Sequence, residues 1–296
     1  MTRAQAGHLA MLAFSVLVAG SFSLGALAAP LIAASALSVA RFALAGVLVG
    51  AVAAGTVGLS RSHWRAPWRY GILGGLLGLY FVLMFEGLRT TSAVPMAAVF
   101  TLTPLMAAGF GWLILGQITT GRMALGLGLG AAGALWVIFR ANLAALMRLD
   151  IGYGEVLYFL GCISHAIYAP MVRKLNRGEP VLIFTLGVMA AGGVLLLVYG
   201  WREVIGTDWV ALPAIVWICI LYVGVAASAI TFVLLQYATL RLPSAKVMAY
   251  TYLVPTWVIL WELALGHDAP PALVLIGVAL TITALLLLLK DETPHP

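Results

Sequence analysis

The chain has 296 residues, of which 63% are hydrophobic and only 9% are charged. Soluble domains carry about 25% charged residues, so the composition excludes a water-soluble globular protein. The net charge of +6 comes from basic residues scattered between apolar runs. This scatter excludes a nucleic-acid-binding surface as well.

Apolar runs of about twenty residues, the length that a bilayer-spanning helix needs, recur along the whole chain. Proline, glycine and charged residues separate these runs, and no segment between them is long enough for a soluble domain. We therefore expect an all-α integral membrane protein. Its ten transmembrane helices are predicted near residues 7–28, 31–55, 68–88, 92–115, 121–140, 152–172, 179–200, 211–236, 244–266 and 270–289.

The distribution of Lys and Arg between the loops predicts the orientation of these helices. If the N-terminus lies inside, most of the basic residues fall in inner loops, as the positive-inside rule requires. We therefore expect both termini to be cytoplasmic. The inner loops would hold Arg3, Arg61, Arg65, Arg69, Arg122, Arg173, Lys174, Arg177, Arg241 and Lys290, and the outer loops Arg89, Arg140, Arg148 and Arg202.

Two ten-residue segments, LRTTSAVPMA at residues 88–97 and LRLPSAKVMA at residues 240–249, are nearly the same. They cover the junction of the third and fourth spans and that of the eighth and ninth. The repeated unit thus holds five spans, and because five is odd, the two copies must cross the membrane in opposite directions. We expect two inverted five-helix repeats, residues 1–146 and 147–296, around a central cavity, as in many secondary transporters. Further matched pairs are Pro104 with Pro255 and Leu115-Gly116 with Leu265-Gly266.

Several short motifs carry a resemblance to a known family. They are Ser38-Val39-Ala40-Arg41-Phe42 in span two, the two Leu-Arg-x-x-Ser-Ala junctions, the prolines of spans four and nine, and Ser164-His165-Ala166-Ile167-Tyr168 followed by Arg173-Lys174 in span six. With these motifs the chain resembles the drug/metabolite transporter superfamily, specifically its ten-helix EamA-type members. It is most similar to the YddG-type exporters of aromatic and other amino acids.

The resemblance implies a bacterial inner-membrane exporter that works by alternating access. Its central cavity would be lined mainly by helices one, three, four, six, eight and nine. One departure concerns the glutamate that many relatives carry after the Leu-Gly of helices four and nine. This chain has Gln117 and His267 there, so no role of that glutamate is carried over.

Two ionisable residues fall near the middle of predicted spans, where charge is costly and often functional. Arg41 either grips a substrate carboxylate or donates to carbonyls of a neighbouring helix and stiffens the packing. His165 either titrates and couples transport to protons or stays neutral as a hydrogen-bonding residue of the cavity. The carboxylates Glu86, Glu155 and Glu262 all fall near outer ends of spans. This favours a facilitator, or His165 as the coupling group.

Aromatic and hydroxyl side chains are the further candidates for substrate contact. By the repeat offset, Tyr80 pairs with Phe232 and Phe100 with Tyr252, all near the predicted midplane. Such rings stack on an apolar or aromatic substrate, and tyrosine hydroxyls fix its orientation. For any one of them, packing between helices is the alternative, and a hydroxyl can also bond its own helix. The full set adds Ser21, Thr101, Tyr168, Tyr250 and Trp257, with Pro104 and Pro255 as hinges or packing kinks.

These observations predict an exporter of neutral amino acids, with aromatic amino acids, methionine and threonine among the substrates. Export of hydrophobic drugs or other metabolites is the alternative within the same class. An intramembrane lipid-modifying enzyme would need paired catalytic groups at one depth, and a sensor or interaction protein would need longer loops. We expect no enzymatic activity, no cofactor and no metal. The partners would be a small-molecule substrate and the bilayer, for which a monomer suffices.

Overall fold

The computed structural model describes residues 3–60, 64–148 and 151–289, and within them all regular secondary structure is helical. Nine helical spans are long and apolar enough to cross a membrane, and α15 (Val274–Leu289) is a shorter apolar helix. The predicted all-α architecture is therefore confirmed. Arg61 and Lys290, which contributed to the predicted orientation, lie outside the described residues.

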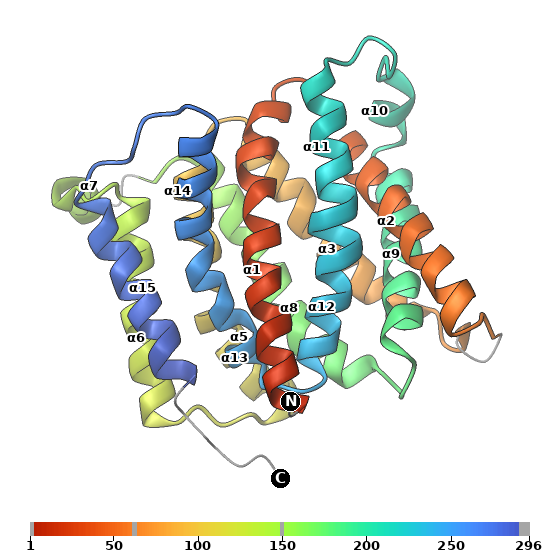
Figure 1. Cartoon of the computed structure of the whole chain (residues 1–296), viewed down its shortest axis with the longest axis horizontal. Helices are drawn as coiled ribbons and strands as arrows, with labels where there is room; N and C mark the ends of the chain where they lie inside the picture. Colours follow the sequence, from red (N-terminus) through yellow and green to blue (C-terminus); the bar gives the residue numbers. More distant parts are fainter. Residues whose placement is uncertain (1–2, 61–63, 149–150, 290–296) are drawn as a thin grey trace.

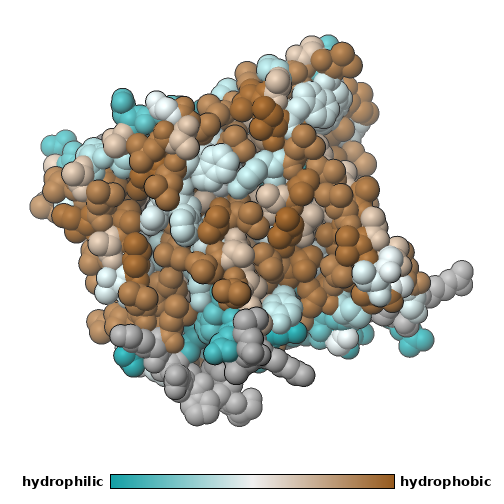
Figure 2. All heavy atoms as spheres, in the orientation of Figure 1, coloured by the Kyte–Doolittle hydropathy of each residue, from teal (hydrophilic) through white to brown (hydrophobic). Residues whose placement is uncertain are grey.

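The helices stand side by side in one bundle (Figure 1). We call the end that holds the start of α1 and the end of α15 the proximal end, and the opposite one the distal end. The face in Figure 2 is hydrophobic over most of its height, and hydrophilic residues lie towards its two ends. The unbroken spans are α1 (Arg3–Ala28), α2 (Ala34–Thr56), α3 (Trp68–Gly87), α6 (Gly121–Ile138), α8 (Tyr153–Leu175) and α9 (Val181–Tyr199).

Three spans are built from consecutive segments. They are α4 (Ala93–Phe100) with α5 (Thr103–Leu115); α11 (Ala214–Gly224), the π-helical η2 (Val225–Ile230) and α12 (Thr231–Thr239); and α13 (Ser244–Ala249), the 3₁₀-helical η3 (Tyr250–Leu253) and α14 (Val254–Ala264). Two short helices that hydropathy did not predict, α7 (Leu143–Arg148) and α10 (Trp201–Gly206), lie in connections at the distal end (Figure 1).

The fourth and ninth spans break at matching places. Pro104 lies in the first turn of α5 and Pro255 in the first turn of α14. A proline leaves the carbonyl four residues earlier without its helical donor. The structure supplies a substitute donor for each carbonyl. The Thr103 hydroxyl donates to the Phe100 carbonyl at 2.6 Å, and the backbone N–H of Val254 donates to the Thr251 carbonyl. Both breaks therefore keep their backbone satisfied, as hydrocarbon surroundings require.

Helices at equivalent places in the two halves pack against each other in antiparallel pairs. Between α6 and α15, a Cβ on Gly133 would lie 2.7 Å from the Gly277 carbonyl, whereas Gly126 meets the side chain of Leu288 near the other end of α15. The pair α2 and α9 runs antiparallel in the same way, since Gly192 approaches Phe42 and Gly50 approaches Leu186. Antiparallel pairing of spans two with seven and five with ten is the arrangement that an inverted repeat produces.

Arg41 connects α2 to the π-helical turn of the eighth span. Its Nε donates to the Ser228 hydroxyl at 2.9 Å and its Nη2 to the Ala227 carbonyl at 2.8 Å. The guanidinium also lies over the ring of Phe81, 3.6 Å from the centroid, and the residue is completely buried. Because a π-turn departs from regular α-helical hydrogen bonding, the Arg41 donors and the altered turn stabilise each other.

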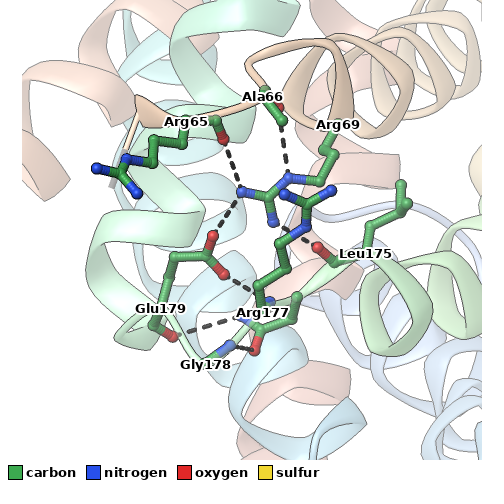
Figure 3. Close-up of polar contacts among 8 residues, drawn as sticks. Arg65, Ala66, Arg69, Leu175, Arg177, Gly178 and Glu179 are labelled. Carbon is green, nitrogen blue, oxygen red and sulfur yellow. Dashed lines mark hydrogen bonds and ion pairs between the residues drawn. The ribbon is translucent and has the colours of Figure 1, made fainter. Parts of the chain in front are cut away.

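A second buried arginine lies at the proximal end, in a network of hydrogen bonds (Figure 3). Arg69, at the start of α3, forms an ion pair with Glu179 at 2.6 Å and donates to the Leu175 carbonyl, also at 2.6 Å. Further donations reach the carbonyls of Arg65 and Ala66, and the N–H of Arg177 donates to Glu179. The two paired side chains are only 2% and 9% exposed. This network, the proximal clamp, fixes the start of α3 to the end of α8 and to the segment before α9.

Removing the carboxylate should show how much the proximal clamp contributes. In Glu179→Gln, Arg69 keeps its carbonyl acceptors but loses its counter-ion, and breaking a buried pair costs about 3–5 kcal/mol. We expect a clear fall in the melting temperature of the purified protein in detergent. Glu86→Gln is the control, because the Arg89–Glu86 pair is 3.5 Å long and exposed on both sides; such pairs contribute about 0–1 kcal/mol. Equal melting temperatures for both variants would contradict a stabilising clamp.

The clamp should also make stability depend on pH. Burial alone would raise the pKa of Glu179, but the hydrogen bonds from Arg69 and from the backbone of Arg177 outweigh it, and the pKa lies below its ordinary 4.5. A lowered pKa stabilises the fold above that ordinary value, and the contribution is lost as the pH falls through the folded-state pKa. The wild-type melting temperature should therefore drop on acidification below 4.5, and by less in Glu179→Gln. Parallel pH curves for the two proteins would show that another group titrates.

Candidate functional site

Six aromatic rings from four helices meet in the interior of the bundle. This central aromatic cluster consists of Phe22 of α1, Tyr80 of α3, Phe100 of α4, and Tyr158, His165 and Tyr168 of α8. The imidazole of His165 is its centre, with ring centroids 4.6 Å from Tyr80, 5.3 Å from Phe100 and 6.3 Å from Tyr168. None of the six side chains is more than 2% exposed.

The sequence of α8 explains why three of these rings point the same way. Tyr158 and His165 are seven residues apart, and Tyr168 follows one turn later, so all three lie along one face of the helix. Gly161 lies between them, and a Cβ there would be only 3.1 Å from the Tyr80 carbonyl. The glycine thus lets α8 approach α3 closely. Ser164 adds a bond across the same pair of helices, from its hydroxyl to the Leu76 carbonyl at 2.7 Å.

Hydrogen bonds satisfy only part of the polar groups in the cluster. The hydroxyls of Tyr80 and Tyr158 bond each other at 2.8 Å, and Gln236 of α12 donates its Nε2 to the Tyr168 hydroxyl at 3.1 Å. Within the described part of the chain, His165 Nδ1 and Gln236 Oε1 are buried without a hydrogen-bond partner. The six cluster residues include no carboxylate and no permanently charged side chain. The site is therefore aromatic and neutral, and two of its polar atoms are left unpaired.

A second group of rings surrounds Arg41 and adjoins the cluster. Phe81 stacks on Phe232 at 5.7 Å and meets Tyr80 at 4.6 Å, and Phe42 contacts both phenylalanines. The predicted candidate Phe232 therefore packs on Phe81, the ring that covers Arg41, and is not among the rings around His165. Arg41 itself donates to the eighth span through Nε and Nη2, and its remaining Nη1 has no hydrogen-bond partner among the described residues.

The other predicted candidates occupy different surroundings. Tyr250 and Trp257 face α1, where the Tyr250 hydroxyl bonds His8 Nδ1 at 3.1 Å and Trp257 Nε1 donates to the Ser15 hydroxyl at 3.2 Å. Tyr252 packs with its ring against Gly130 of α6. The Thr101 hydroxyl bonds its own helix at the Ala98 carbonyl, and the Ser21 hydroxyl is buried without a partner in the described chain. Of the predicted set, the structure thus brings together Tyr80, Phe100, His165 and Tyr168.

Three residues of this site were not predicted from the sequence: Phe22, Tyr158 and Gln236. A usable signal existed for Tyr158, because a spacing of seven residues before His165 places both side chains on the same face of a helix. For Phe22 and Gln236 the sequence offers no such spacing, since their neighbours in the cluster come from distant spans. Among the described residues, no group of three or more His, Cys, Asp or Glu is placed to hold a metal ion.

Comparisons with known proteins agree with this architecture. The chain is 25% identical over 261 residues to the uncharacterized transporter YyaM of Bacillus subtilis (strain 168), covering 88% of this chain and 86% of that protein. It is 23% identical to an uncharacterized transporter of Archaeoglobus fulgidus, with 83% and 84% covered. A protein of known crystal structure superimposes with a TM-score of 0.72 over 96% of this chain and 95% of the other, at 21% identity, and so shares the fold.

The family comparison matches both halves of the chain. The model of the EamA-like transporter family fits residues 5–139 and again residues 152–290. Together the two matches include every transmembrane span of the bundle. The protein therefore belongs to the EamA-like transporter family.

Proposed function

We propose that the protein exports neutral amino acids across the bacterial inner membrane, with aromatic amino acids, methionine and threonine as substrates. The central aromatic cluster carries this proposal, because it combines buried ring faces with neutral polar groups between helices of both halves. The resemblance to YddG-type exporters supports the same substrate class. Ring faces stack on an apolar or aromatic side chain, and the hydroxyl, imidazole and amide groups orient it.

Transport proceeds by alternating access between two inverted units, residues 1–146 and 147–296. The fourth and ninth spans are the moving elements, because each breaks before a proline, at Pro104 and at Pro255. Phe100 is the last residue of α4, directly before the first break. A change of angle between α4 and α5 therefore changes the position of a cluster ring.

The orientation follows from the basic residues, so the proximal end, where α1 begins and α15 ends, faces the cytoplasm, and both termini are cytoplasmic. The substrate is a single small molecule, and the only further partner is the bilayer; a monomer contains the complete cluster. No cofactor or metal takes part, and the protein is a transporter and not an enzyme. Export of hydrophobic drugs is the second candidate, which the aromatic and uncharged lining of the cluster also favours.

Transport follows the substrate gradient and is not coupled to protons. The carboxylates of Glu86, Glu155 and Glu262 lie towards the distal end, each already bound to Arg89, Thr91 or His267. A proton-coupled transporter uses an ionisable group at depth, and the deep candidate His165 lies among rings that offer its charged form no counter-ion. His165 therefore acts as a neutral polar residue of the site.

Flux of labelled tryptophan into proteoliposomes tests the substrate class. We expect saturable, protein-dependent uptake that unlabelled methionine and threonine inhibit. Phe100→Ala should raise the half-saturation concentration of tryptophan about fivefold or more, since an aromatic pair contributes about 0.5–1.5 kcal/mol beyond its buried area. Phe159→Ala is the control, because that ring lies on the same helix, α8, but outside the cluster, and is 38% exposed. Absence of flux for every amino acid in the panel would overturn the assignment and favour drug export.

The same liposomes test coupling. An imposed pH gradient should leave the initial rate of tryptophan uptake unchanged, because no carboxylate takes part in the cluster and the imidazole stays neutral. His165→Asn should then alter the half-saturation concentration without creating a response to the gradient. Uptake that accelerates with the gradient in the wild type but not in His165→Asn would instead make His165 the coupling residue.

A further inference from the structure

We propose that the central aromatic cluster recognises its substrate through an amine, which donates hydrogen bonds to Gln236 Oε1 and His165 Nδ1, the two unpaired acceptors next to Tyr168. This inference rests on the proposed function, because it concerns the same site, and it names the chemical group that the site requires. Its consequence is that an amine-bearing ligand binds whether or not it carries a carboxylate, whereas a carboxylate without an amine does not bind.

The two acceptors are buried and lie next to the same tyrosine. Gln236 is 1% exposed and donates its Nε2 to the Tyr168 hydroxyl, so its amide is held in place while Oε1 stays unpaired. His165 is 2% exposed and stacks on Tyr168 with 23° between the ring planes, and its Nδ1 is also unpaired. Buried polar atoms in proteins nearly always have partners, and exceptions need an explanation. A ligand that binds here supplies the partner for both.

The surroundings decide which kind of ligand group fits. A carbonyl oxygen such as Gln236 Oε1 accepts hydrogen bonds and cannot donate them, so the ligand must bring the donor. The rings of Tyr80, Phe100 and Tyr168 enclose the imidazole, and ring faces attract ammonium groups. A neutral imidazole offers one acceptor nitrogen, and in this apolar interior without a carboxylate neighbour the neutral form is favoured.

Arg41 is the feature that would favour the opposite recognition. Its Nη1 is unpaired as well, and a guanidinium binds carboxylates. However, its Nε and Nη2 are already held by Ser228 and Ala227 of the eighth span, and the plane of the group is covered by Phe81. Phe81 also meets Tyr80, so the guanidinium adjoins the cluster with only its Nη1 unpaired among the described residues. We therefore assign recognition to the acceptors beside Tyr168 and test the arginine as the rival.

A competition assay with three indole compounds distinguishes recognition of the amine by Gln236 and His165 from recognition of the carboxylate by Arg41. Labelled tryptophan and, separately, labelled tryptamine are bound to the purified full-length protein, and unlabelled tryptophan, tryptamine and indole-3-propionate compete. We expect tryptamine to compete within about tenfold of tryptophan, and indole-3-propionate to be weaker than tryptamine by about a hundredfold, because two hydrogen bonds from a charged donor are lost.

Variants of Gln236 make the test specific to the proposed acceptors. Gln236→Leu should weaken tryptamine binding about tenfold or more and leave indole-3-propionate unchanged. Gln236→Glu keeps the shape and the acceptor and adds a negative charge, so it should tighten tryptamine binding and weaken indole-3-propionate further. The second variant keeps the test decisive if the leucine variant does not fold.

The outcomes distinguish this inference from the proposed function. If tryptophan binds but indole-3-propionate competes as well as tryptamine, the amine site is wrong and Arg41 is the anchor, while amino-acid transport stands. If tryptamine binds and tryptophan does not, the amine site stands and amino-acid export is wrong. If neither labelled compound binds, the inference is overturned together with the proposed substrates.

Discussion

The packing of this bundle depends on the Arg41 guanidinium, whose donors have to find acceptors in a region without water. In hydrocarbon, unsatisfied polar groups are costly, and the solution here is a π-turn in the neighbouring span. The turn brings the Ala227 carbonyl and the Ser228 hydroxyl to the arginine. The second, third and eighth spans are thereby joined, since Phe81 of α3 covers the guanidinium plane. One buried cation thus decides both the local winding of the eighth span and the position of its neighbours.

The aromatic cluster follows from this frame. Phe81 lies on Arg41, and the next residue back, Tyr80, reaches the hydroxyl of Tyr158 on α8. A row of residues on one face of α8 then brings the imidazole of His165 against Phe100, at the break of the fourth span. The site therefore lies between α3 and α8, which the proximal clamp joins, and the segmented fourth and eighth spans. A neutral lining suits the alternating access proposed above, because no charge has to be solvated again if the helices change their angles.

The sequence predicted the spans and the family well, because these depend on hydropathy and on short motifs. It predicted the site less completely, for reasons visible in particular residues. The repeat offset pairs Tyr252 with Phe100, yet only Phe100 lies in the cluster. Phe100 ends an α-helix, whereas Tyr252 belongs to a 3₁₀ turn with three residues per turn and packs against Gly130 of α6. The ion pair between Arg69 and Glu179 joins residues 110 positions apart. A pattern within one segment of the sequence cannot predict a contact over that distance.

The distance along the chain between Arg41 and its acceptors has a consequence for biosynthesis. Arg41 and Ser228 are separated by 187 residues, so the second span enters the membrane long before the eighth has left the ribosome. During that interval the guanidinium has none of its final acceptors. Arg69 likewise lacks two of its partners, Leu175 and Glu179, until the sixth span and the loop after it are synthesised. The first half of the chain therefore stays incompletely packed until translation is almost finished. Assembly of the bundle is a late event, and the final spans complete the burial of charges that the early spans carried into the bilayer.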